Sequence, residues 1–180
     1  LAGIAASLIV KGDDGEDNLD VFAVESAVAS GFITSTEITG FNMNGGVDGS
    51  KIVYETIEGM SLTLGSADDE VTIHSTHAGA TEIKSNGGAD SVTVLTTSGA
   101  LTVDTGTGPD DVFVESISFP AFIHTGDNND SIHVGSSVDG LSGIREKLTV
   151  QGQADEDSLV LDDSANQFLT TSQLTATGFT

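Results

Sequence analysis

The sequence predicts an all-β fold: a parallel β-helix, or solenoid, with coils of about 20 residues. Two observations favour it. A pattern of Gly, small or acidic residues, Asp and then alternating apolar residues recurs six times, and apolar residues of consecutive copies fall in the same rows. An antiparallel β-sandwich is the alternative, because short strands with frequent turns suit it too. A sandwich, however, does not predict stacking of equivalent positions at a constant offset.

The six copies begin at Gly12, Gly65, Gly87, Gly106, Gly126 and Gly152. In each copy one Asp stands two residues before the first apolar residue: Asp17, Asp69, Asp90, Asp110, Asp130 and Asp157. The middle spacings of 21, 20 and 20 residues set the length of the coil. At this offset Val92, Val112 and Ile132 form one row, and residues between such rows alternate outward, which is the period of a strand.

The 52 residues between Asp17 and Asp69 lack clear copies of the pattern. We expect coils with degenerate turns there, with strands near residues 32–38, 51–57 and 61–64. Seven coils would then fill about 140 residues. Gly and Asp belong at the corners, because Gly supplies positive φ and Asp bonds to nearby backbone.

A longer period lies over the short one. The segment LAGIAASLIVKG from Leu1 is echoed by LSGIREKLTVQG from Leu141, at an offset of 140 residues. We therefore expect residues 1–140 to form one complete long repeat of about seven coils. Residues 141–180 would be the start of the next repeat, packed on the same solenoid.

The composition excludes several classes of function. Asp and Glu number 28 against 5 Lys and Arg, giving a net charge of −23, so nucleic acid and anionic membrane surfaces are poor partners. The absence of Cys excludes disulfides, thiolate zinc sites and Cys nucleophiles. No nucleophile, phosphate-binding or zinc-protease motif is present. We expect no enzyme, and a polysaccharide-acting enzyme is the least favoured reading.

The turns GTGPDDVFV, GDNNDSIHV and GGADSVTV resemble the Gly- and Asp-rich turns of giant secreted bacterial surface proteins built from long-period β-solenoid repeats. The resemblance covers nearly the whole chain and implies a repetitive fold at the cell exterior. There is a more distant likeness to the calcium-binding turns of the repeats-in-toxin family. That family repeats every nine residues, whereas this chain has one such turn per coil, and only GTGPDDVFV keeps the G-x-G-x-D spacing.

Stacked coils would bring the turn acids into columns one strand spacing apart. Ca²⁺ is the cofactor that such oxygen-rich clusters would take, because it accepts six to eight oxygen ligands in loose geometry. The candidate metal ligands are Asp90, Asp110, Asp111, Asp127 and Asp130, with a second pair of clusters at Asp13 and Asp17 and at Asp155 and Asp157. The alternative is that each Asp bonds only backbone amides in its turn.

The sequence thus predicts a structural extracellular repeat protein, a stalk, adhesin spacer or filament subunit that stacks end to end. Its partners would be neighbouring copies or adjoining repeats, because uncapped solenoid ends are adhesive edges. Outward Ser and Thr residues could also carry or contact glycans. A calcium-dependent adhesion or binding module is the alternative function.

Overall fold

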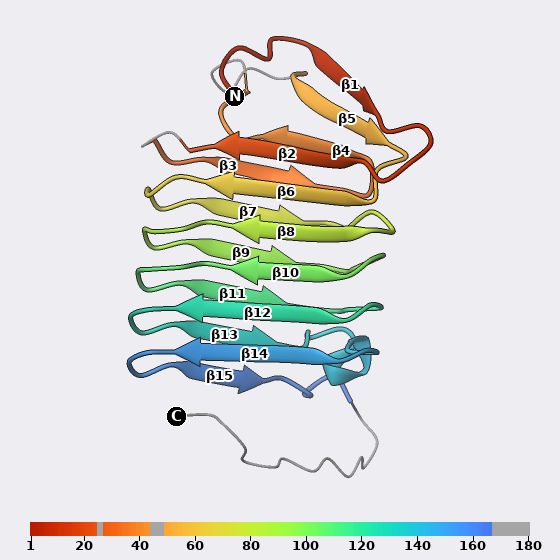
Figure 1. The fold of residues 1–180 in the computed structure, drawn as a ribbon. Helices are drawn as coiled ribbons and strands as arrows, with labels where there is room; N and C mark the ends of the chain where they lie inside the picture. The colour runs from red at the N-terminus through yellow and green to blue at the C-terminus, as the bar shows by residue number, and fades with distance from the viewer. Residues whose placement is uncertain (25–26, 44–48, 167–180) are drawn as a thin grey trace.

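The computed structural model describes residues 1–24, 27–43 and 49–166 of the 180-residue chain. The chain winds between two stacked β-sheets, a nine-stranded and a six-stranded one, and most neighbouring strands are parallel (Figure 1). The fold is all-β and of the parallel β-helix class, as the sequence predicts, and the antiparallel sandwich is excluded.

The nine-stranded sheet contains, in spatial order, β1 (Ser7–Lys11), β5 (Lys51–Glu55), β4 (Glu37–Gly40), β3 (Ser30–Ile33), β7 (Glu70–Ile73), β9 (Ser91–Val94), β11 (Asp111–Val114), β13 (Ser131–Val134) and β15 (Ser158–Leu161). The six-stranded sheet contains β14 (Leu148–Gln153), β12 (Ala121–Gly126), β10 (Leu101–Asp104), β8 (Ala80–Lys84), β6 (Gly59–Leu64) and β2 (Asn18–Ala23). A single turn of 3-10 helix, Gly140–Gly143, interrupts the longer connection from β13 to β14.

Coils from β6 to β13 repeat with the register that the sequence predicts. Val112 of β11 pairs with Val92 of β9 and with Ile132 of β13. All three are fully buried, because alternate side chains of both sheets point into the space between them. On the six-stranded sheet, Asp104 pairs with Lys84 and His124, and these side chains point outward. The core is thus a set of apolar rows that run along the solenoid axis.

The expectation of degenerate coils between Asp17 and Asp69 is wrong. β4 lies antiparallel to both β3 and β5, so the chain folds back on itself instead of completing coils. Thr34 drives the reversal: its hydroxyl accepts the Glu37 N–H at 2.9 Å, and its own N–H donates to the Glu37 carbonyl at 2.9 Å. The described part of residues 1–140 therefore has five two-strand coils rather than about seven, starting with β2–β3, and β14–β15 adds a sixth.

This reversal closes the N-terminal end of the core. Phe41, Met43 and Tyr54 follow β4 or lie on β5, and none is more than 2% exposed. The Tyr54 hydroxyl donates to the Thr34 carbonyl at 2.5 Å, so the buried phenol keeps a partner. The last regular coil at this end is covered by large side chains.

The two copies of the long repeat do not occupy equivalent places. β14 and β15 echo β1 and β2 in sequence, yet β14 lies in the six-stranded sheet and β1 in the nine-stranded one. β14 stacks on β12 of the coil before it, whereas β1 pairs with β5, which comes later in the chain. Strand neighbours, more than local sequence, decide which sheet a segment joins.

We predict that Val112→Ala lowers the free energy of unfolding by about 2 kcal/mol, because it removes two buried methyl groups and leaves a cavity. Val160→Ala is the matched control, since Val160 is 45% exposed and should change stability by less than about 0.5 kcal/mol. Chemical denaturation measures both. Equal losses for the two variants would contradict the assignment of inward and outward rows.

Candidate functional site

The most unusual chemical feature is a column of buried aspartates at one corner of the solenoid. Each lies in the turn that leads from the six-stranded to the nine-stranded sheet. Four of them, Asp69, Asp90, Asp110 and Asp130, are at most 3% exposed. Ionisable carboxyls are seldom buried so completely without cationic partners, so their contacts require an account.

One carboxylate oxygen of each aspartate accepts a backbone N–H from the preceding coil. The donor and acceptor pairs are Ala29 to Asp69 (2.6 Å), Asp69 to Asp90 (2.8 Å), Asp90 to Asp110 (2.8 Å), Asp110 to Asp130 (2.9 Å) and Asp130 to Asp157 (3.1 Å). We call this series the aspartate ladder. It joins six consecutive coils with side-chain to backbone bonds that are separate from the strand pairing.

The second carboxylate oxygen, Oδ2, of each of the four buried aspartates accepts no hydrogen bond. Hydroxyl groups stand beside three of them: Ser85 at Asp90, Thr105 at Asp110 and Thr125 at Asp130. The Thr105 hydroxyl, however, donates to the Thr125 carbonyl at 2.8 Å. Its proton is therefore directed along the axis and not at the carboxylate.

Burial raises the pKa of all four carboxyls, because the low-dielectric interior disfavours their charged form. The pKa of Asp90 rises to about 6. The bonds from backbone N–H groups act in the opposite direction, and the neighbouring carboxylates of the ladder raise the pKa further. Each carboxyl in the column thus binds its proton more tightly than a free aspartate does.

The other predicted metal ligands lie apart from this column. Asp111 and Asp127 are exposed beside it, and Asp155 Oδ2 accepts the Asn128 N–H at 3.0 Å. Asp13 and Asp17 lie in the turn from β1 to β2, at the opposite end of the solenoid from Asp155 and Asp157. Asp17 is not part of the ladder; its N–H donates to Glu58 Oε2 at 2.8 Å.

Among the described residues, no group of three or more His, Cys, Asp or Glu side chains has an arrangement that could hold a metal ion. Nor does that part of the chain contain a helix long and apolar enough to span a membrane. The arrangement suits hydrogen bonding of backbone amides, which is the alternative reading of the turn acids.

Sequence reasoning missed a second set of buried polar residues at the opposite corner. The Thr76 hydroxyl accepts the N–H groups of Ser98 and Gly99, both at 2.9 Å. One coil on, the Thr97 hydroxyl accepts those of Ser118 and Phe119 at 3.0 and 3.1 Å. The spacing of 21 residues between the two threonines was a visible signal, but threonine is common enough here to hide it.

Hollows interrupt the surface of the described residues, and two of them bear on function. A shallow one of about 260 Å³ lies on the outer face of the six-stranded sheet, where Gly59 and Ala80 leave space between Asp20 and Glu82. A larger one of about 460 Å³ lies at the C-terminal end and is lined by apolar side chains. These are Val134, Leu141, Ile144, Leu148, Val150, Leu159 and Leu161.

Comparison with protein-family models, with curated protein sequences and with solved structures finds no match to this chain. The geometry of the ladder and of the solenoid ends therefore carries the functional argument by itself.

We predict that Asp110→Ala lowers the free energy of unfolding by about 2 kcal/mol, because the buried Asp90 N–H loses its acceptor. Asp110→Asn keeps an acceptor oxygen without a buried charge and should be at least as stable as the wild type at pH 7. Asp111→Ala, at an exposed neighbour, is the control. Denaturant titration that ranks Asp110→Ala beside Asp111→Ala would contradict the ladder.

We also predict that the protein becomes more stable as the pH falls from 7 to 5. The folded pKa of Asp90, about 6, exceeds that of an unfolded aspartate, so the folded state binds the proton more tightly. Its contribution is complete below about pH 4 and is lost as the pH rises through about 6.

Thermal unfolding at both pH values measures this effect. Asp90→Asn should reduce the pH dependence, whereas Asp111→Asn removes the same charge from the surface and should leave most of it in place. A midpoint that is higher at pH 7 than at pH 5 would contradict the effect of burial.

Proposed function

We propose that the chain is a structural, mechanically stable spacer of the cell exterior, a stalk or adhesin spacer whose length is set by stacked coils. The observation that carries this proposal is the aspartate ladder, which runs parallel to the pairing of strands over six coils. Extending the molecule along its axis would have to break both sets of bonds together, and bonds loaded in parallel resist force better than bonds loaded in sequence.

The surface supports the same role. Its outward rows carry Ser, Thr, Asp and Glu, and the net charge of −23 keeps neighbouring molecules apart and hydrated. Within the described residues, the larger hollow lies at an end and the other is shallow and holds no set of facing acids and bases. The geometry therefore favours a spacer over an enzyme. An extracellular location follows from the proposed role, and glycans remain candidate surface partners.

A calcium-dependent adhesion module is the competing function, and one experiment separates the two. The chain is pulled from its ends in a single-molecule force measurement, with calcium and again in excess chelator. The spacer proposal expects one cooperative extension at the same force in both conditions, because in this proposal backbone N–H groups, and not calcium ions, hold the carboxylates of the ladder.

A force that falls strongly in chelator would favour the calcium module, since a ligand bound only by the folded state stabilises it. Gradual extension of single coils at low force in both conditions would overturn the spacer itself. Asp110→Ala should lower the extension force, and Asp111→Ala is its matched control.

A further inference from the structure

Three strands of the molecule contain no buried residue: β1, β14 and β15. Every other strand in the described part of the chain contains at least one. β1 stands at one end of the solenoid and the other two at the opposite end (Figure 1). Incomplete burial is therefore confined to the two ends, where apolar strands lack a neighbouring coil.

The C-terminal end is open over the core. The inward side chains of β14 and β15, Leu148, Val150 and Leu159, are only partly buried, and Leu161 is 47% exposed. They line the hollow of about 460 Å³ together with Leu141 and Ile144. This contrasts with the N-terminal end of the core, which Phe41, Met43 and Tyr54 cover completely.

The backbone edges at this end also face outward. The N–H of Ser158 donates to the carbonyl of Asp130, just before β13, and that of Asp162 to the carbonyl of Val134 in β13, both at 2.8 Å. Because alternate residues of a parallel strand bond to opposite neighbours, the N–H groups of Leu159 and Leu161 are directed away from β13. β14 is likewise the last described strand of its sheet. A further strand could add to either edge.

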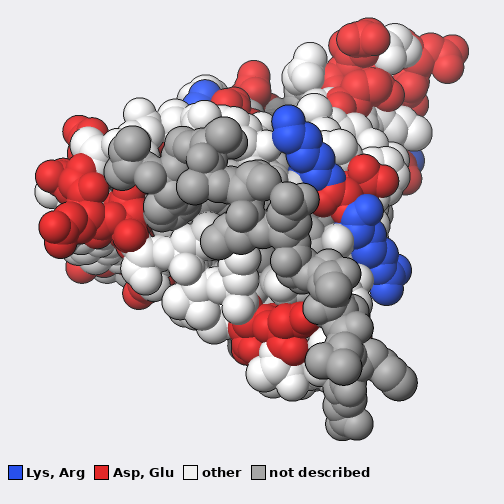
Figure 2. Space-filling view, turned by 90° about the horizontal axis from the view of Figure 1, so that it is seen from below, with Lys and Arg blue, Asp and Glu red and all other residues white. Residues whose placement is uncertain are grey.

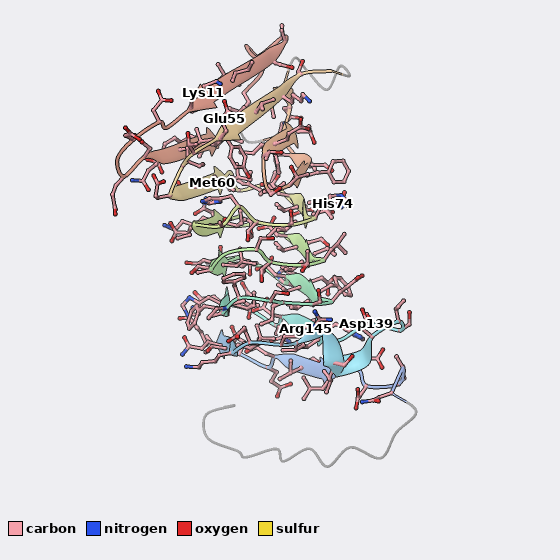
Figure 3. All side chains as sticks on the ribbon, turned by 90° about the vertical axis from the view of Figure 1, so that its right-hand side faces the viewer. Lys11, Glu55, Met60, His74, Asp139 and Arg145 are labelled. Carbon is pink, nitrogen blue, oxygen red and sulfur yellow. The ribbon has the colours of Figure 1, made fainter. Side chains whose placement is uncertain are left out.

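β1 at the other end has the properties of such a strand. It is the last described strand of the nine-stranded sheet, with Leu8 45% and Ile9 62% exposed. Lys11 and Glu55 form an ion pair that ties it to β5 and leaves its outer edge accessible (Figure 3). Its sequence echoes that of β14, so it carries the apolar alternation of a strand that stacks on this solenoid.

Charge selects the direction in which β1 of a second copy would approach β14. Arg145 and Lys147, with Glu146 between them, precede β14, and the acidic residues 155–157 follow it; Figure 2 shows Lys and Arg on one side of this end, with some acidic residues beside them, and a group of Asp and Glu on the other. β1 ends at Lys11, which is paired with Glu55, and is followed by Asp13, Asp14 and Glu16, while residues 1–7 carry no charged side chain. Antiparallel pairing sets acids against bases, whereas parallel pairing would set acids against acids.

We propose that this chain associates head to tail: the edge strand β1 of one copy adds antiparallel to β14 of a second copy and places Leu8, which lies on the core side of β1 beside buried Ile52, over the open apolar end. The contact is heterologous, so it propagates into linear chains of copies. This head-to-tail association gives the proposed spacer its partner, a second copy of the chain. Its biological role rests on the spacer proposal, but its test does not depend on that proposal.

The test is sedimentation of the 180-residue chain from low to high micromolar concentration. The mean mass should rise with concentration through dimers to longer species. Leu8→Lys and Leu161→Lys should each weaken association at least about tenfold, because each buries a charge in the contact. Phe113→Lys is the matched control: Phe113 is 40% exposed on an outer face in mid-solenoid, and this variant should associate as the wild type does.

Mixing the two end variants gives the sharpest result. Leu8→Lys keeps an intact C-terminal end and Leu161→Lys keeps an intact β1, so the mixture should form one-to-one dimers and nothing longer. Direction is tested by charge exchange. Lys147→Glu should weaken association, and Asp14→Lys in the same chain should restore it.

Three outcomes would overturn the proposal. If Leu8→Lys associates like the wild type, the contact joins two C-terminal ends. If Leu8→Lys and Phe113→Lys weaken association equally, the contact is unspecific. If the full chain stays monomeric while a chain ending at residue 166 associates, residues 167–180 cover the open end. A monomeric chain that resists force cooperatively would leave the spacer standing, so the two proposals fail separately.

Discussion

Parallel stacking in register is the constraint on which the rest of the structure depends. At an offset of 20 residues, each side chain lies directly over its equivalent in the next coil, so the inward rows and the turn aspartates meet residues of the same kind. For Val112 between Val92 and Ile132 this repetition is favourable, since each apolar row buries itself. For carboxylates the same repetition would be repulsive, and the corner turns must resolve it.

The ladder answers this repulsion with backbone N–H groups. Each buried carboxylate turns one oxygen toward a backbone N–H of the coil before it, so that charge meets a dipole and not another charge. Burial and the remaining repulsion between carboxylates raise the pKa values of the four buried aspartates, and the pKa of Asp90 reaches about 6. Uptake of protons is then the simplest way for the column to lower its free energy, because a protonated carboxyl no longer repels the next.

The sequence predicts the regular part of this molecule well because each type of residue occupies one fixed position in every coil: the β-branched apolar residues lie in the strands and the aspartates in the turns. The rows of Val and Ile and the position of each turn Asp follow from period alone, and the register confirms them. The predicted strand near residues 51–57 corresponds to β5, but the antiparallel β4 could not be predicted, since the Thr34 to Glu37 turn has no periodic signal. The different sheets of β1 and β14 depend on neighbouring strands, which matching sequences do not reveal. The sequence also predicts that the aspartates lie in the turns, but only the structure shows that each carboxylate accepts a backbone N–H of the preceding coil.

The ladder also has a direction, and this direction agrees with the difference between the two ends. In each step a backbone N–H of one coil donates to the aspartate carboxylate of the following coil. The first residue of the series therefore only donates, and it has no earlier N–H to accept. Ala29 stands there, and it is buried. At the other end, the Asp157 carboxylate accepts the Asp130 N–H of the coil before it. A further step of the same kind would need a carboxylate in a following coil to accept the Asp157 N–H. The ladder therefore begins at a residue without a carboxylate and ends, within the described residues, at Asp157, at the same end of the solenoid as the partly exposed apolar rows.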